Sequence, residues 1–162
     1  MKFISHEEGR YVLRLDKREH DALMAVLGLR AHLTRKNPSL MADTIVDPKL
    51  KEAESDLHAA LEENRKELST ALTSLMEDPE KVSNQGRGKL LKMEASDLDL
   101  VLRGLNDARI AAWESLGSPD FDQGQRPEVN DDNFLGLWTI QATDLFQSFL
   151  LAVLHEIGRA HV

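Results

Sequence analysis

The residue with the clearest chemical potential is an arginine set within an apolar helical pattern. Apolar side chains recur at three- and four-residue spacing over residues 95–116, which predicts one face of a helix. That face comprises Leu98, Leu102, Leu105, Ala112, Trp113 and Leu116. Arg109 falls in its middle, and Arg30 sits similarly among apolar residues of an earlier predicted helix. A guanidinium in such a place needs a carboxylate, backbone carbonyls or an open pocket, because an unpaired buried charge costs several kcal/mol.

Two interpretations of Arg109 follow. In the first, Arg109 binds an anionic ligand bidentately, with Asn106 and Arg30 contributing. In the second, Arg109 forms a structural ion pair that fixes helix packing, with Asp144 on the last predicted helix as the candidate partner. We favour the ion pair. A deep pocket around Arg109 would favour a ligand, and a packed, dry Arg109 would exclude one.

The other polar residues form no recognisable catalytic or metal-binding set. Asp107 has no second acid or histidine beside it and lies one turn from Arg103, which favours a surface ion pair. His58 has Glu54 and Glu62 one turn away on either side, and no histidine pair has zinc-site spacing. Residues 86–89 contain only a fragment of a phosphate-loop pattern. We therefore expect no catalytic residue, no metal site and no cofactor.

The last predicted helix is apolar on two sides. Its stronger apolar face comprises Phe134, Trp138, Leu145, Phe149 and Ala152. A second, weaker face comprises Leu137, Ile140 and Leu151 and is the candidate interaction surface. Such a helix is either central in its domain or shared with a partner, and we favour the central position.

Composition limits the classes of function. The 162 residues suit one domain, and 41% of them are hydrophobic, which favours a folded protein. The net charge of −8 disfavours non-specific binding to nucleic acid. There is no cysteine, the N-terminus lacks the pattern of a signal peptide, and no uninterrupted apolar run reaches about 18 residues. We expect a cytoplasmic protein without a membrane span.

The predicted fold is all-α: a four-helix bundle-like domain with a small N-terminal β-hairpin. The hairpin is predicted from Phe3-Ile4, a turn at Glu8-Gly9 and the alternating run 11–15. The helices are predicted from caps, prolines and glycines, the first by an Asp16/Glu19 capping box. They cover about 16–36, 48–77, 95–116 and 131–155, with polar loops at 79–88 and 118–130.

There is a faint internal repeat. Residues 13–16 and Glu19 match residues 91–94 and Asp97 in type and spacing. Each copy predicts a strand that leads into an acid-capped helix, and the two strands would then pair at the edge of a small sheet. The match is short enough to arise by chance.

The last seven residues do not continue the pattern before them. Residues 156–162 read Glu-Ile-Gly-Arg-Ala-His-Val, which is also what a widely used sequencing adapter encodes in one frame. We interpret residues 1–155 as a single helical domain and 156–162 as a non-native tail, and expect the natural C-terminus to differ.

Several of these segments together resemble a known family. The stretch Leu102–Ile110, with Leu-Asn-Asp-Ala-Arg in it, resembles the signature of an uncharacterised, mainly actinobacterial family of helical proteins. Residues 11–16 look like that family's start, and residues 135–138 look like its end. The resemblance implies a small helical protein without established activity, and some members carry a transcriptional-regulator label. Ser115 stands where the family usually has a basic residue, which weakens an anion-binding role.

We therefore predict a non-enzymatic interaction or regulatory protein, whose partner is another protein or a second copy of the chain. The first alternative is a DNA-associated regulator, although the only basic segment spans 87–92 and predicts no recognition helix. The second alternative is a binder of a small anion, or an enzyme, that uses Arg109.

Overall fold

The computed structural model describes residues 1–7, 9–29, 48–121, 124 and 127–160, and of residues 156–160 the helical backbone alone. Four strands form one antiparallel sheet in the order β1-β2-β4-β3. Their bounds are β1 Lys2–Glu7, β2 Arg10–Asp16, β3 Val82–Gln85 and β4 Gly88–Glu94. The helices are α1 Lys17–Leu29, α2 Pro48–Glu77, α3 Ala95–Ser115 and α4 Phe134–Ala160.

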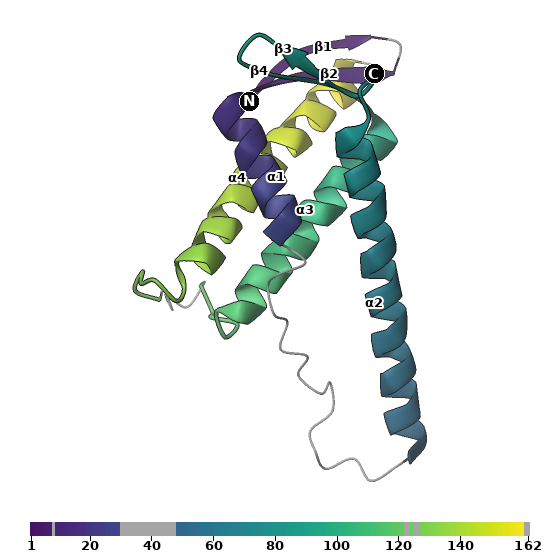
Figure 1. Ribbon diagram of the computed structural model, residues 1–162, viewed down its shortest axis with the longest axis vertical. Helices are drawn as coiled ribbons and strands as arrows, with labels where there is room; N and C mark the ends of the chain where they lie inside the picture. Colours follow the sequence, from purple (N-terminus) through teal and green to yellow (C-terminus); the bar gives the residue numbers. More distant parts are fainter. Residues whose placement is uncertain (8, 30–47, 122–123, 125–126, 161–162) are drawn as a thin grey trace.

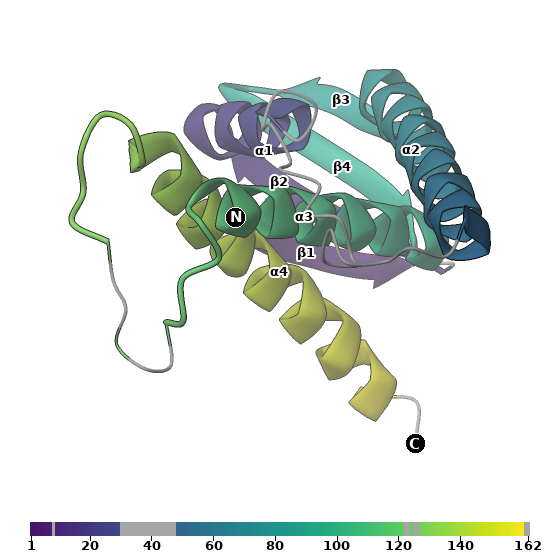
Figure 2. The same cartoon turned by 90° about the horizontal axis from the view of Figure 1, so that it is seen from below.

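The sheet lies across one end of the molecule and the helices run away from it (Figure 1). Viewed from below, α1, α3 and α4 lie on one face of the sheet, with α2 beside β3 (Figure 2). The core fills the space between this face and the helices. It comprises Tyr11, Leu13, Leu15, Leu23, Val26, Leu72, Leu75, Met76, Leu91, Met93, Leu98, Val101, Leu105, Ala108, Phe146, Leu150 and Val153.

The prediction of an all-α bundle is wrong, because a four-stranded sheet forms one layer of the protein. The N-terminal hairpin and the strand near residues 89–93 are present, but the segment predicted as a loop contains β3. Strand β3 has only four residues, and its outer two, Asn84 and Gln85, are exposed at the sheet edge. A short polar edge strand carries little alternation, so the sequence pattern did not reveal it.

The helices follow the predicted ends closely. Helix α2 is continuous over its 30 residues, from Pro48 to Glu77. The capping box at α1 is confirmed, since the Asp16 amide donates to Glu19 Oε2 at 2.8 Å and the Glu19 amide donates to Asp16 Oδ1 at 2.9 Å. The predicted continuation of α1 to residue 36 lies outside the described residues. Helix α4 continues through Ala160, into the segment interpreted as a foreign tail.

The internal repeat extends to the whole ββαα unit. Strand β4 begins 78 positions after β2, at Gly88 against Arg10, and α3 begins 78 positions after α1, at Ala95 against Lys17. The strands β2 and β4 pair with each other, and Leu13 stands opposite its own counterpart Leu91. When two repeated strands pair antiparallel and one residue lies opposite its own repeat, the strand pair has a local two-fold axis at that residue. The pairing of β2 with β4 is therefore pseudo-twofold symmetric about the Leu13–Leu91 pair.

Several buried positions also share this offset. Leu72 and Leu75 of α2 correspond to Leu150 and Val153 of α4, and all four are buried. On the inner helices, Leu23 corresponds to Val101, and both are buried. Each half thus contributes a hairpin, an inner helix and an outer helix to one shared core.

The start of α3 is held by a partly buried ion pair. Asp97 accepts hydrogen bonds from Lys81 Nζ at 2.7 and 2.8 Å, and from the Glu94 amide at 2.9 Å. The hydrogen bond to Asp97 raises the pKa of Lys81 above its usual value of 10.5, although burial opposes the shift. This contact ties the segment before β3 to the first turn of α3.

The close approach of β2 and β4 gives a first prediction. A Cβ at Gly88 would lie 2.2 Å from the Leu15 carbonyl oxygen, so Gly88→Ala forces the two strands apart. We expect a loss of about 1–3 kcal/mol in the free energy of unfolding, measured by urea denaturation. Gly28→Ala is the matched control, because a Cβ at this position meets no atom within 4 Å. Alanine is also more favourable than glycine inside a helix, so this substitution should not destabilise the protein. An equal effect of the two substitutions would contradict the account.

The Lys81–Asp97 pair gives a pH prediction. Because the folded pKa of Lys81 is raised, its stabilising contribution is complete below 10.5 and is lost as the pH rises through the folded pKa. The unfolding free energies of wild type and Lys81→Met should differ by a constant amount at neutral and mildly alkaline pH. The difference should then shrink in more alkaline solution. A difference that stays constant throughout would show that the pair contributes no linked stability.

Candidate functional site

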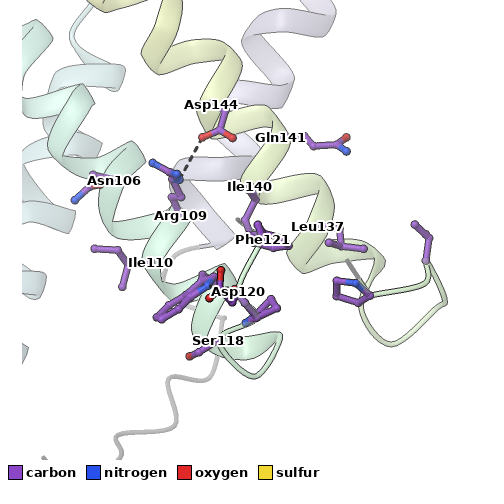
Figure 3. Close-up of a pocket in the computed structure, with 14 residues that line it drawn as sticks. Asn106, Arg109, Ile110, Ser118, Asp120, Phe121, Leu137, Ile140, Gln141 and Asp144 are labelled. Carbon is purple, nitrogen blue, oxygen red and sulfur yellow. Dashed lines mark hydrogen bonds and ion pairs between the residues drawn. The ribbon is translucent and has the colours of Figure 1, made fainter. Parts of the chain in front are cut away.

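A cleft between α3, α4 and the segment joining them is the candidate site. Its volume is about 940 Å³, and Figure 3 shows its residues projecting from both helices and from the connecting segment. The described lining residues are Asn106, Arg109, Ile110, Trp113, Ser118, Pro119, Asp120, Phe121, Pro127, Val129, Leu137, Ile140, Gln141 and Asp144. The site is therefore built entirely from the second half of the chain.

Small residues allow α3 and α4 to pack closely below this cleft. On α3 the buried face includes Ala108, Ala111 and Ala112, each fully buried. On α4, a Cβ at Gly136 would lie 3.0 Å from the Leu116 side chain, so only a glycine fits there without displacing its neighbour. This close approach at the end of α3 brings the first turns of α4 to the second half of α3.

The segment after α3 folds back and forms the end of the cleft. Helix α3 ends at a glycine as predicted, and Gly117 and Ser118 both have positive φ, at 84° and 57°. The indole N–H of Trp113 donates to the Pro119 carbonyl at 2.9 Å. That hydrogen bond holds the returning chain beside α3, so that Phe121 and Asp120 face the cleft in Figure 3.

Arg109 and Asp144 face each other across the cleft. Arg109 Nε lies 3.2 Å from Asp144 Oδ1, and the contact joins α3 to α4 (Figure 3). The side chains are 51% and 52% exposed, so the pair is in contact with solvent. Arg109 thus lies at the margin of the packed face of α3 and not in its middle, where helical periodicity had placed it.

The structure brings most of the sequence-predicted site residues together. Asn106, Leu137 and Ile140 line the cleft beside Arg109. Leu151 lies three turns beyond Ile140 on α4, outside the lining, and is 56% exposed. Arg30 lies outside the described residues. The part of the lining that comes from the connecting segment was not predicted, although Gly117-Ser118-Pro119 was a signal for a sharp turn. This part comprises Ser118, Pro119, Asp120, Phe121, Pro127 and Val129.

The packed face of α4 differs from the predicted one. The buried residues are Gly136, Thr139, Thr143, Phe146, Leu150 and Val153. By contrast, Phe134 and Leu145 of the predicted stronger face are 57% and 69% exposed. Thr139 and Thr143 enter the core because their hydroxyls donate to the Leu135 and Ile140 carbonyls of α4, both at 2.8 Å. Helix α4 is thus peripheral, and the prediction of a central position is wrong.

Helix α4 is also long and apolar enough to cross a membrane. Over Phe134–His155 its length and composition meet that test, and 28% of its most apolar window is buried in the structure. Counting only uninterrupted apolar runs missed this property, because threonines, a glycine and Asp144 interrupt the run. The core helix of a soluble protein passes the same test, so the finding is weak evidence for a span.

The cleft combines apolar surface with a few charged side chains. Among its described lining residues, Arg109 is the cation, and Asp120 and Asp144 are the two acids. Asp144 pairs with Arg109, so the charge of this arginine is already compensated inside the cleft. The arrangement therefore favours an occupant that is largely apolar.

The chain matches no protein-family model, no curated protein and no solved structure. The resemblance to the actinobacterial family therefore stays a prediction.

The exposure of the Arg109–Asp144 pair leads to a prediction for stability. We expect Arg109→Met to change the unfolding free energy by less than about 1 kcal/mol in urea denaturation, because solvent-exposed ion pairs contribute little. Asp144→Asn should behave alike. A loss of about 3 kcal/mol or more, as for a broken buried pair, would show that the pair is needed for helix packing.

Proposed function

We propose that this chain is a non-enzymatic protein-interaction protein, and that the α3–α4 cleft docks a short segment of a partner. The segment carries apolar side chains and at least one lysine or arginine. We place the protein in the cytoplasm, in keeping with its lack of cysteine. The family resemblance is part of the proposal and implies no activity that conflicts with it.

The observation that carries the proposal is the chemistry of the cleft lining. Apolar groups such as Ile110, Phe121 and Ile140 lie beside Trp113, and aromatic residues together with arginine are typical of protein interfaces. A volume of about 940 Å³ accommodates several side chains. The net charge of −8 of the whole chain attracts a basic segment and repels an acidic one.

The residues that line the cleft differ in type from their counterparts in the first half of the chain. At the 78-residue offset, Arg109 and Asp144 correspond to Ala31 and Lys66, and Ile140 corresponds to Glu62. The duplicated scaffold accounts for the shared core residues, but not for these differences. Arg109, Ile140 and Asp144 all line the cleft, which supports a role in binding.

The two alternative functions have less support. An anionic ligand would compete with Asp144 for Arg109 and would lie near Asp120, so it gains little charge stabilisation. For DNA binding, Lys92 lies on β4 within the sheet and not on a helix. Around it on the open sheet face, Lys2 and Arg14 are accompanied by Glu7 and Glu94, which leaves little net charge.

Peptide selection tests the proposal. We expect random peptides displayed against the intact chain to enrich apolar sequences with a basic residue. Ile140→Asp should weaken the binding of a selected peptide by about tenfold or more, because it adds a desolvated charge to the apolar side of the cleft. Binding is measured by fluorescence anisotropy of a labelled peptide, and circular dichroism checks that the variant folds.

Leu151→Asp is the matched control, because it places the same charge on the same helix at an exposed position outside the cleft. It should leave peptide affinity unchanged. Enrichment of acidic peptides, or equal losses from Ile140→Asp and Leu151→Asp, would rule out the cleft as the docking site.

A further inference from the structure

Helix α4 carries a second apolar strip, on the side of the helix between its packed face and the cleft. Its residues lie on one side of the helix, because an α-helix turns by about 100° per residue. Together with Gln141, they follow one another along the helix at intervals of three or four residues, the spacing of a helix–helix contact. We define this outward face as Phe134, Trp138, Leu145, Phe149 and Ala152. Phe134 and Leu145 are 57% and 69% exposed, whereas Trp138 and Phe149 are half-buried, with one side packed against the core and the other open.

The charge of this surface restricts what can cover it. The chain has a net charge of −8, so two copies repel each other wherever their acidic surfaces meet. The outward face has no ionisable side chain, and from Phe134 to Leu154 the helix contains a single acid, Asp144, which is paired with Arg109. Two copies can therefore meet here without like-charge repulsion at the contact. A basic partner gains nothing at this neutral face, and an acidic chain is repelled by anionic lipid.

The order of residues along the face is complementary to itself. When two α4 helices run antiparallel, Phe134 is level with the partner's Ala152, a large side chain opposite a small one. Trp138 is then level with the partner's Phe149, and Leu145 with the partner's Gln141. Each layer occurs twice about a two-fold axis, as an isologous dimer requires. The two aromatic layers also supply edge or offset ring contacts.

We propose that a second copy of this chain covers the outward face, in an antiparallel α4–α4 pair about a two-fold axis. The proposal does not rest on the docking of a partner segment in the cleft. The cleft lies on the neighbouring side of α4, and Gln141 borders both surfaces. The other cleft-lining residues of α4, Leu137, Ile140 and Asp144, are not part of the contact. The assembly would present two equivalent docking sites.

Sedimentation velocity over a range of concentrations tests the proposal on the intact chain. We expect the wild type to sediment as a dimer. Leu145→Asp should raise the dimer dissociation constant by about a hundredfold or more, because it places a charge at the centre of the contact. Leu151→Asp adds the same charge about 120° away around the helix and should leave the dimer intact. A wild type that stays monomeric, or equal dissociation of both variants, would overturn the proposal.

Cysteine cross-linking tests the antiparallel register. The chain has no cysteine, so introduced thiols are the only ones present. The double variant Phe134→Cys/Ala152→Cys should form disulfide-linked dimers on mild oxidation, whereas Phe134→Cys alone should not. Linkage of Phe134→Cys to itself would indicate a parallel pair and overturn the register. A monomer that floats with phosphatidylcholine vesicles, and loses this property in Leu145→Asp, would show that lipid covers the face instead.

Discussion

The pairing of β2 with β4 is the constraint on which the rest of the structure depends. It joins the two halves of the chain across the Leu13–Leu91 pair, and the absence of a side chain at Gly88 allows the strands to approach. Each strand leads directly into a helix through an acidic cap, Asp16 with Glu19 and Glu94 with Asp97. The sheet therefore sets the direction of α1 and α3. Because α2 and α4 pack on these two helices, their positions also depend on the sheet.

The duplicated scaffold is symmetric in its core and asymmetric in its possible function. Equivalent positions of the two outer helices bury Leu72 and Leu150 alike, since both halves contribute to one shared interior. The cleft has no such equivalence, because its ion pair and its apolar wall on α4 exist only in the second half. A pair of similar units can thus keep a common core while one of them acquires a binding surface.

Local signals in the sequence predicted local structure well. The capping box of α1, the continuous α2 and the glycine at the end of α3 follow from short-range chemistry, and each is present. Helical phase also identified Arg109, Asp144, Leu137 and Ile140 as candidates, and the structure places these residues around one cleft.

The errors arose where tertiary context decides. Strand β3 is short and polar, and it is stabilised by pairing with β4 rather than by its own pattern. Thr139 and Thr143 are buried because their hydroxyls bond to carbonyls of their own helix, so residue type alone did not place these two positions in the core. The part of the cleft wall formed by residues 118–121 follows the Trp113–Pro119 hydrogen bond, which no spacing rule predicts.

The two tryptophans allow one direct test, because Trp113 lines the cleft and Trp138 belongs to the outward face. Their indole N–H signals can be followed by NMR while a selected basic, apolar peptide is added to the intact chain at constant protein concentration. The account predicts that the Trp113 signal shifts with the added peptide, as its hydrogen bond to Pro119 is perturbed, and that the Trp138 signal stays in place. A shift of Trp138 alone, or of neither signal, would contradict docking in the cleft.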